Sequence, residues 1–368
     1  MSYTTIDDPS AHFQTLTYTG NASYPRNLTN DGNSDLKPDF IWLKNRGYNG
    51  TDHVLTNSSV GFDAPNSPSA GGQMASNSSG GENVPNATYG YISAHLTDGF
   101  TAQTGGTNGD TVNWNTYEFV AWQWKAAGGT TASNSDGSIT STVQANTTAG
   151  FSIITYTGTG GAETFGHGLG VAPDMWIIKR RNGTGSWAVG FNDSNILGGT
   201  SKYLILQGSG ATSTYSNFWG TSPASSTVMR IAGDATIGGS SNTYVAYAWA
   251  QKQGYSKFGT YTGNGNANGT FVYTGFKPAC VITKETSGSG GNWRIFDNKR
   301  AGYNDDNYRL TPNENSAEST STHLDLYSNG FKFRNTGTSY NGSGDSYIYM
   351  AWAENPFVTS TGIPTTAR

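Results

Sequence analysis

Short stretches of alternating hydrophobic and polar residues recur along the chain in a fixed order, three times over. Each copy begins with an aromatic stretch that ends in Tyr-Thr-Gly. It continues with a proline, an apolar run and a lysine six residues after the proline, and it closes on Tyr-x-x-x-Ala-Trp. Short aromatic and β-branched runs bounded by Gly, Asn and Pro predict β-strands. The landmarks are Tyr18, Tyr156 and Tyr261 for the first stretch, Pro38, Pro173 and Pro278 for the second, and Tyr117, Tyr244 and Tyr347 for the third.

The prolines and lysines mark the two ends of one strand in each copy. Proline lacks an N–H group and is tolerated at the first position of a strand, so each proline marks where pairing begins. The apolar run behind it suits a central strand that is covered on both faces. We expect the closing lysines, Lys44, Lys179 and Lys284, to return the chain to water.

The Tyr-x-x-x-Ala-Trp stretches place a small residue and a large ring on opposite faces of a strand, because side chains alternate along it. An alanine leaves room for a neighbouring ring, which favours packing of these tryptophans in the core. The alternative is an aromatic platform for a sugar. The residues are Ala121 with Trp122, Ala248 with Trp249, and Ala351 with Trp352.

Two further signals complete each copy. Trp187 and Trp293 stand eight and nine residues after their lysines, and His53 takes the same place in the first copy. This spacing predicts a hairpin loop and a return strand. The strings TDGF and SNGF, which end at Phe100 and Phe331, predict a turn followed by a strand; the second copy has VMRIAG there.

The repeats predict an all-β chain of three tandem β-sandwich domains of the jelly-roll or lectin-like type. A β-propeller is the competing repeat fold, but three blades of this length are too few and too long. The string AAGGTTASNSDG predicts a flexible linker, and SITSTVQAN after it predicts the first strand of the second domain. The expected divisions are an N-terminal arm (1–12), repeat 1 (13–126), the linker (127–136), repeat 2 (137–252), repeat 3 (253–357) and a C-terminal tail (358–368).

Composition and charge narrow the class of protein. The 50 glycines, with many Ser, Thr and Asn, disfavour long helices. A net charge of −4, with no basic run longer than residues 179–181, argues against a nucleic-acid partner. No apolar run reaches the roughly 18 residues of a membrane span, and the amino terminus has no secretion signal, so we expect no membrane insertion. The single cysteine, Cys280, is expected to be a small buried apolar residue.

Longer phrases resemble a known family. They are the opening IDDPSAHFQTLTYTG, the junction phrase GHGLGVAPDMWIIKRR, and the ending SNGFKFR with YIYMAWAENPF. They are similar to a repeated β-rich domain family in virion proteins of marine tailed bacteriophages, which are tail-fibre-like proteins of phages of cyanobacteria and ocean heterotrophs. The resemblance covers nearly the whole chain and implies a virion surface component that touches the host envelope. It implies no functional residue.

The sequence offers little to catalysis or metal binding. It contains none of the strings GxSxG, HExxH or GxxxxGK[ST], so we expect no enzyme, no catalytic residue and no cofactor. A polysaccharide depolymerase that uses two acids far apart in sequence is the alternative. The oxygen-rich strings at 31–35 and 303–308 are expected to form turns rather than Ca²⁺ sites, and no metal is expected.

Loop-mediated recognition on a virion surface is the function we predict. Weak contacts to a host cell-surface glycan or another envelope component, multiplied in a homotrimer, give avidity. Repeat 3 is expected to be distal, and the amino-terminal residues to attach the protein to other virion proteins. The alternative is a structural virion protein without receptor binding: a capsid decoration, head fibre or tail adaptor. The candidate binding residues are the loop aromatics Tyr303, Tyr308 and Tyr340, each with core packing as its alternative.

Overall fold

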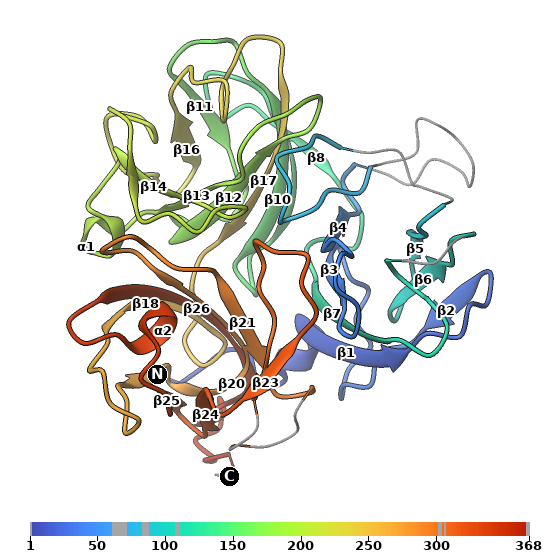
Figure 1. The fold of residues 1–368 in the computed structure, drawn as a ribbon. Helices are drawn as coiled ribbons and strands as arrows, with labels where there is room; N and C mark the ends of the chain where they lie inside the picture. Colours follow the sequence, from blue (N-terminus) through green and yellow to red (C-terminus); the bar gives the residue numbers. More distant parts are fainter. Residues whose placement is uncertain are drawn as a thin grey trace.

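The computed structural model describes residues 2–60, 72–82, 88–106, 111–300, 304 and 307–365. With 41% of the chain in strands and 3% in helices, the predicted all-β class is confirmed. Figure 1 shows three lobes that follow one another in sequence, from blue through green to red, and meet at a common centre.

Each lobe is built on antiparallel strands in the same spatial order, in which the strand that leads into the Tyr-Thr-Gly glycine pairs with the last strand of the repeat. The last strand then pairs with the strand that follows the proline, and that strand pairs with the return strand. The order in repeat 1 is β1 (Phe13–Thr19), β7 (Glu118–Trp124), β3 (Phe40–Asn45) and β4 (Val54–Asn57). In repeat 2 it is β10 (Phe151–Thr157), β17 (Thr243–Trp249), β12 (Met175–Arg180) and β13 (Ala188–Phe191), and in repeat 3 it is β18 (Ser256–Thr262), β26 (Ser346–Pro356), β20 (Phe276–Glu285) and β21 (Arg294–Asp297).

Smaller strands and three short helices complete the lobes. Repeat 1 adds β2 (Arg26–Leu28), β5 (Tyr91–His95) and β6 (Phe100–Gln103), preceded by the 3₁₀ turn η1 (Pro9–Ala11). Repeat 2 adds β8 (Ala132–Asn134), β9 (Ser141–Asn146), β11 (Glu163–Gly166), α1 (Ser194–Leu197), β14 (Lys202–Ile205), β15 (Ser213–Thr214) and β16 (Val228–Ile231). Repeat 3 adds β19 (Phe271–Tyr273), β22 (Asn307–Arg309), β23 (Ser319–Ser321), β24 (Leu324–Tyr327), β25 (Gly330–Phe333) and α2 (Thr338–Asn341).

Several local predictions are confirmed. The return strands β4, β13 and β21 begin directly after His53, Trp187 and Trp293, and the SITSTVQAN stretch contains β9. The turns before Phe100 and Phe331 lead into β6 and β25. The prediction of a flexible linker is wrong for residues 132–134. They form strand β8, which pairs with β9 and extends the repeat 2 sheet.

The interior differs from three separate sandwiches. One cluster of buried side chains draws on all three repeats, since the inner faces of the three main sheets turn toward each other. The outer faces of repeats 1 and 2 pack against their smaller strands in clusters of their own. At the centre stand Trp124, Trp249 and Trp352, each at most 2% exposed, whose ring centroids lie 5.1 to 6.2 Å apart in edge-to-face contact. The expectation that each repeat closes its own interior is therefore wrong.

In repeat 1, the strand pairs place the counterpart of the Tyr-x-x-x-Ala-Trp stretch two residues later than the sequence motif predicts. The strand pairs show that Tyr156 lies opposite Tyr244, Tyr261 opposite Tyr347, and Tyr18 opposite Phe119. The counterpart of the two later tyrosines is therefore Phe119, and Tyr117 precedes the strand. Trp122, Trp249 and Trp352 are all buried, which confirms core packing, but the counterpart of the latter two is Trp124.

Candidate functional site

The three lysines that close the apolar strands do not reach water. Lys44, Lys179 and Lys284 are all 0% exposed, which corrects the prediction from the sequence. Each ammonium donates hydrogen bonds to neutral oxygens of nearby loops. Lys44 Nζ bonds Asn45 O and Thr51 Oγ1, Lys179 Nζ bonds Ser79 O and Gly185 O, and Lys284 Nζ bonds Ser209 O and Glu285 O, at 2.6 to 3.2 Å.

These lysines make stability depend on pH. Burial lowers the pKa of Lys44 to about 7 and the pKa values of Lys179 and Lys284 to about 8. An unfolded lysine has a pKa of about 10.4, so above pH ~8 the unfolded chain binds more protons than the folded one. The free energy of unfolding is therefore expected to rise with pH, by at least about 1 kcal/mol between pH ~8 and ~9, and to fall toward pH ~7.

Urea unfolding at a series of pH values measures this effect. Lys44→Met removes one of the titrating groups and should flatten the rise, because it leaves no buried amine at that position. Lys299→Met, at a lysine side chain that is 38% exposed, is the matched control and should leave the slope unchanged. Equal slopes in wild type and Lys44→Met would contradict the prediction.

The repeats are joined to one another by a cyclic set of hydrogen bonds. Trp187 of repeat 2 donates from Nε1 to Ala75 O of repeat 1 at 2.9 Å, and Trp293 of repeat 3 donates to Ile205 O of repeat 2 at 3.0 Å. His53 Nε2 of repeat 1 lies 3.1 Å from Thr311 O of repeat 3. The residue before each return strand thus contacts the neighbouring repeat, and the last contact closes the ring.

The three seams of this ring carry different side chains at equivalent places. Arg46 pairs with Glu318 at 2.7 Å and Arg181 with Glu82 at 2.9 Å, whereas a neutral hydrogen bond from Thr212 to the carbonyl of Thr286 takes this place in the third seam. Deeper in the seams, Asp297 accepts from Trp122 Nε1 at 3.0 Å and Asn57 Nδ2 donates to Tyr247 OH at 2.9 Å. The corresponding residues of the third seam are the buried Phe191 and Met350.

Of the three predicted binding tyrosines, the two that the structure describes are not exposed loop residues. Tyr303 lies outside the described residues. Tyr308 is half-buried in β22, with the Arg46 guanidinium 5.4 Å from its ring centroid, at the seam between repeats 1 and 3. Tyr340 is only 6% exposed and stacks on Phe333, so its prediction as a loop contact is wrong.

Tyr340 is buried because it fills a repeated core position. In each repeat, the hydroxyl of the tyrosine in Tyr-Thr-Gly donates a hydrogen bond to a backbone carbonyl. The residue with this carbonyl lies seven positions before the first aromatic residue of the last strand. In the three repeats, Tyr18 donates to Val112 O, Tyr156 to Ile237 O and Tyr261 to Tyr340 O. Tyr340 is therefore the counterpart of Val112 and Ile237.

The turn that follows this position has the same backbone in all three repeats. In repeat 1, Thr116 N donates to Gly20 O and Gly20 N to Tyr117 O, at 2.9 and 2.7 Å. A Cβ atom on Gly20 would lie 1.9 Å from Trp114 O, so the Tyr-Thr-Gly glycine is required for the close approach. The same two bonds recur between Gly158 and the turn 239–242 and between Gly263 and the turn 342–345.

The side chains on this turn differ sharply between repeats. Repeat 1 carries Trp114 and Tyr117, stacked at 4.2 Å and 21°, and Tyr48 stands nearly perpendicular to both at 4.8 and 5.8 Å. We call these three residues the ring cluster. Tyr48 is 38% exposed and the other two rings are half-buried. The sequence analysis missed the cluster because it placed Tyr117 inside the strand.

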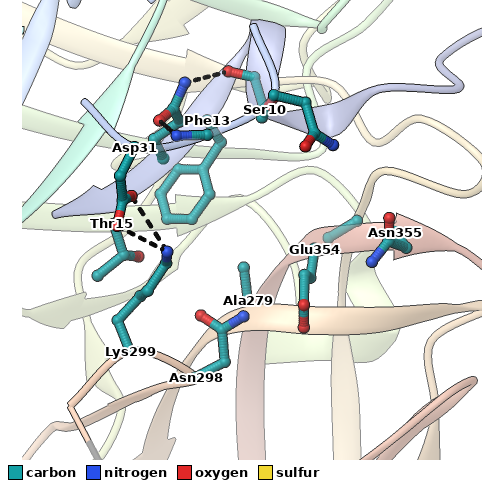
Figure 2. Close-up of a pocket in the computed structure, with 13 residues that line it drawn as sticks. Ser10, Phe13, Thr15, Asp31, Ala279, Asn298, Lys299, Glu354 and Asn355 are labelled. Atoms are coloured by element: carbon teal, nitrogen blue, oxygen red, sulfur yellow. Dashed lines mark hydrogen bonds and ion pairs between the residues drawn. The ribbon is translucent and has the colours of Figure 1, made fainter. Parts of the chain in front are cut away.

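A cavity of about 300 Å³ lies between repeats 1 and 3, at the opposite end of β7 from the ring cluster. Figure 2 shows Ala279 between Asn298 and Glu354, with the Phe13 ring above them and Lys299 facing Asp31. Lys299 Nζ lies 3.1 Å from Asp31, and Lys277 pairs with Glu354 at 2.6 Å. The lining is thus polar, and its charges are balanced in pairs.

The cavity lies at a position where the sequence of repeat 3 differs from the sequences of repeats 1 and 2. The residue that follows the proline is Asp39 in repeat 1 and Asp174 in repeat 2, and its counterpart is Ala279. Asp39 accepts from Ala126 N at 2.7 Å, and Asp174 accepts from Gln251 N at 2.7 Å. Because alanine lacks the carboxylate, the equivalent position in this seam is part of the cavity lining.

Other chemistry was sought in the described part of the chain. There, no three His, Cys, Asp or Glu side chains gather into a group able to hold a metal ion. Cys280 is fully buried, which confirms its predicted place, and burial raises the pKa of its thiol. Among the helices formed by described residues, none has the length and apolar character to cross a membrane.

Comparison with known proteins gives one match. A family model described as "Domain of unknown function (DUF7483)" matches residues 8–356. No curated protein and no solved structure matches the chain. The matched span runs from just before β1 to the end of β26, so it covers all three repeats of the ring together.

Proposed function

Since the chain belongs to the family Domain of unknown function (DUF7483), whose description assigns no activity, we propose, from the resemblance of its repeated phrases to virion proteins of marine tailed bacteriophages, that it is a bacteriophage virion surface protein. In this proposal it is a tail-fibre or fibre-like component that binds the host cell surface and acts as a homotrimer beside other virion proteins. We also propose that each repeat, with its main sheet and smaller strands, is one β-sandwich unit fused to the others through the shared core.

The observation that carries the proposal is the contrast between a constant backbone and variable side chains. The turn before the last strand keeps its two hydrogen bonds to the Tyr-Thr-Gly glycine in every repeat. Its side chains change from Trp114 and Tyr117 to Gly239 and Asn242, and then to Gly342 and Asp345. A rigid scaffold that presents loops of differing chemistry is the usual organisation of a recognition protein.

Catalysis is not part of the proposal. Asp31 and Glu354 both line the cavity, and each is paired with a lysine. A glycosidase needs one protonated carboxyl group as its general acid. We therefore propose no catalytic role for this pair of carboxylates.

A structural role is the second candidate, and the cavity favours it. A polar cavity of about 300 Å³ at a seam between repeats can accept a side chain or a chain end from a neighbouring virion protein. In that case the ring cluster would contact another protein of the particle instead of a host cell.

Adsorption to cells tests the proposed function. Fluorescently labelled protein is mixed with a panel of marine cyanobacteria and heterotrophic bacteria, and the bound fraction is measured. We expect saturable adsorption to the cells of at least one strain, and a fall in phage infection of that strain when unlabelled protein is added. Folded protein that adsorbs to no strain would contradict receptor binding and favour the structural role. Sedimentation analysis tests the homotrimer.

A further inference from the structure

The ring cluster of Tyr48, Trp114 and Tyr117 has no aromatic counterpart in the other two repeats, although Trp114 and Tyr117 also pack against the repeat 1 core. Counting from the strand landmarks, the counterpart of Tyr48 is glycine in the other two repeats, at Gly183 and Gly288. The counterpart of Trp114 is glycine in both other repeats, and the counterpart of Tyr117 is Asn242 in repeat 2 and Asp345 in repeat 3. The same turn with the same hydrogen bonds thus forms twice without any ring.

We propose that the ring cluster binds a neutral glycan by contact with the faces of its pyranose rings. The inference rests on the proposed recognition function and names the site and the ligand class for it. The face of a pyranose carries C–H groups of slight positive charge, which are attracted to the negative face of an aromatic ring. The hydroxyl groups at its rim need polar partners, and Asn115 and Thr116 are exposed beside the cluster.

The loops that carry the rings are held in place before any ligand binds. Gly50 N donates to Asn315 O at 2.9 Å, and Asn49 Oδ1 accepts from Ala317 N at 2.8 Å, so the loop of Tyr48 is anchored to repeat 3. The turn of Trp114 is anchored to Gly20, as described above. Because these loops are already ordered, little conformational entropy is lost on binding.

Charge selects the class of glycan. Glu118, next to Tyr117, is the exposed acidic group beside the cluster, with a side chain that is 60% exposed. Its ion pair to Arg46, at 3.4 Å, leaves it open to solvent. In a chain of net charge −4, this carboxylate disfavours sulfated sugars, uronic acids and nucleic acid. An uncharged hexose chain fits the rings and the exposed amide and hydroxyl groups together.

The experiment replaces the three rings by residues that the fold already uses at the equivalent places of repeat 2. The triple variant Tyr48→Gly, Trp114→Gly and Tyr117→Asn is compared with wild type on an array of neutral β-linked glucose, galactose and N-acetylglucosamine oligosaccharides, with sulfated and uronic-acid oligosaccharides beside them. We expect wild type to bind one or more neutral oligosaccharides and the triple variant to lose that binding. Trp114→Gly alone should weaken it about tenfold.

Tyr215→Ala is the matched control, because Tyr215 is 47% exposed on repeat 2, away from the cluster. It should bind like wild type, and circular dichroism should show that all variants are folded. Absence of binding to every neutral oligosaccharide, preference for the anionic ones, or unchanged binding by the triple variant would each overturn the inference. The cell assay separates the two proposals: adsorption retained by the triple variant rejects this site but keeps the recognition function, whereas failure of wild type to adsorb rejects the function.

Discussion

Trp124→Ala is expected to lower the free energy of unfolding by about 3 to 5 kcal/mol and to weaken all three repeats at once. Trp124 is 1% exposed and contacts the rings of Trp249 and Trp352 from the other two repeats. Removing its indole leaves a hole in the core that the repeats share, so the loss cannot stay within repeat 1. Guanidinium unfolding measures the size of the effect.

Hydrogen exchange measures how far that effect spreads. Slow amide protons of β7, β17 and β26 should lose protection together in Trp124→Ala, because the three strands face the same cluster. Tyr215→Ala, on the surface of repeat 2, should change stability by less than about 0.5 kcal/mol. Loss of protection confined to repeat 1 would show that the repeats fold as separate domains.

Asp297→Ala is expected to cost about 3 to 5 kcal/mol, since it breaks a buried ion pair and leaves a charge behind. The side chains of Asp297 and Arg300 are 0% exposed and lie 2.6 Å apart. Arg300 also contacts Glu318, and its guanidinium lies 5.5 Å from the centroid of the Trp122 ring. Without the aspartate, the buried Arg300 side chain loses this ion pair and keeps its contact with Glu318 and its hydrogen bond to Ile295 O.

Two further variants show whether the broken buried ion pair causes the loss. The double variant Asp297→Leu with Arg300→Met removes both charges and should recover at least half of the lost stability in urea unfolding, because buried pairs can be replaced by apolar residues. Lys299→Ala breaks an exposed pair with Asp31 and should cost no more than about 1 kcal/mol. A double variant less stable than Asp297→Ala would refute this explanation.

The strand landmarks could be predicted because they depend on local sequence. Proline, apolar run and lysine lie within seven residues, and the return strands follow a hairpin of short length, so the chain needs no distant partner to define them. The register of the last strand was harder to predict from the sequence. In repeat 1 the motif ends at Trp122, and a second tryptophan, Trp124, stands two residues later. Aligning the strand on either tryptophan leaves every side chain on the same face of the sheet. The strand pairs separate the two alignments: Tyr18 lies opposite Phe119, and Phe40 lies opposite Trp124.

Features that depend on distant segments could not be read from local patterns. A lysine at the end of a strand ordinarily reaches water, but the oxygen that Lys179 bonds belongs to Ser79, in another repeat. The shared core likewise has no local signal, since a sheet with two apolar faces suits either a sandwich or a ring. Tyr340 could have been assigned to the core from its offset to Tyr347, which equals that of Ile237 to Tyr244.

Closure of the ring limits how the number of repeats in the chain can change. In a solenoid each repeat contacts its two neighbours, so copies are added or lost without disturbing the rest. Here His53 of the first repeat contacts Thr311 of the last, and three indoles fill the centre. Deleting one copy would expose that centre, and a fourth would find no place around it. The closed ring therefore ties the number of repeats to the shared centre, while side chains differ between the repeats both at the surface turns and in the buried seams.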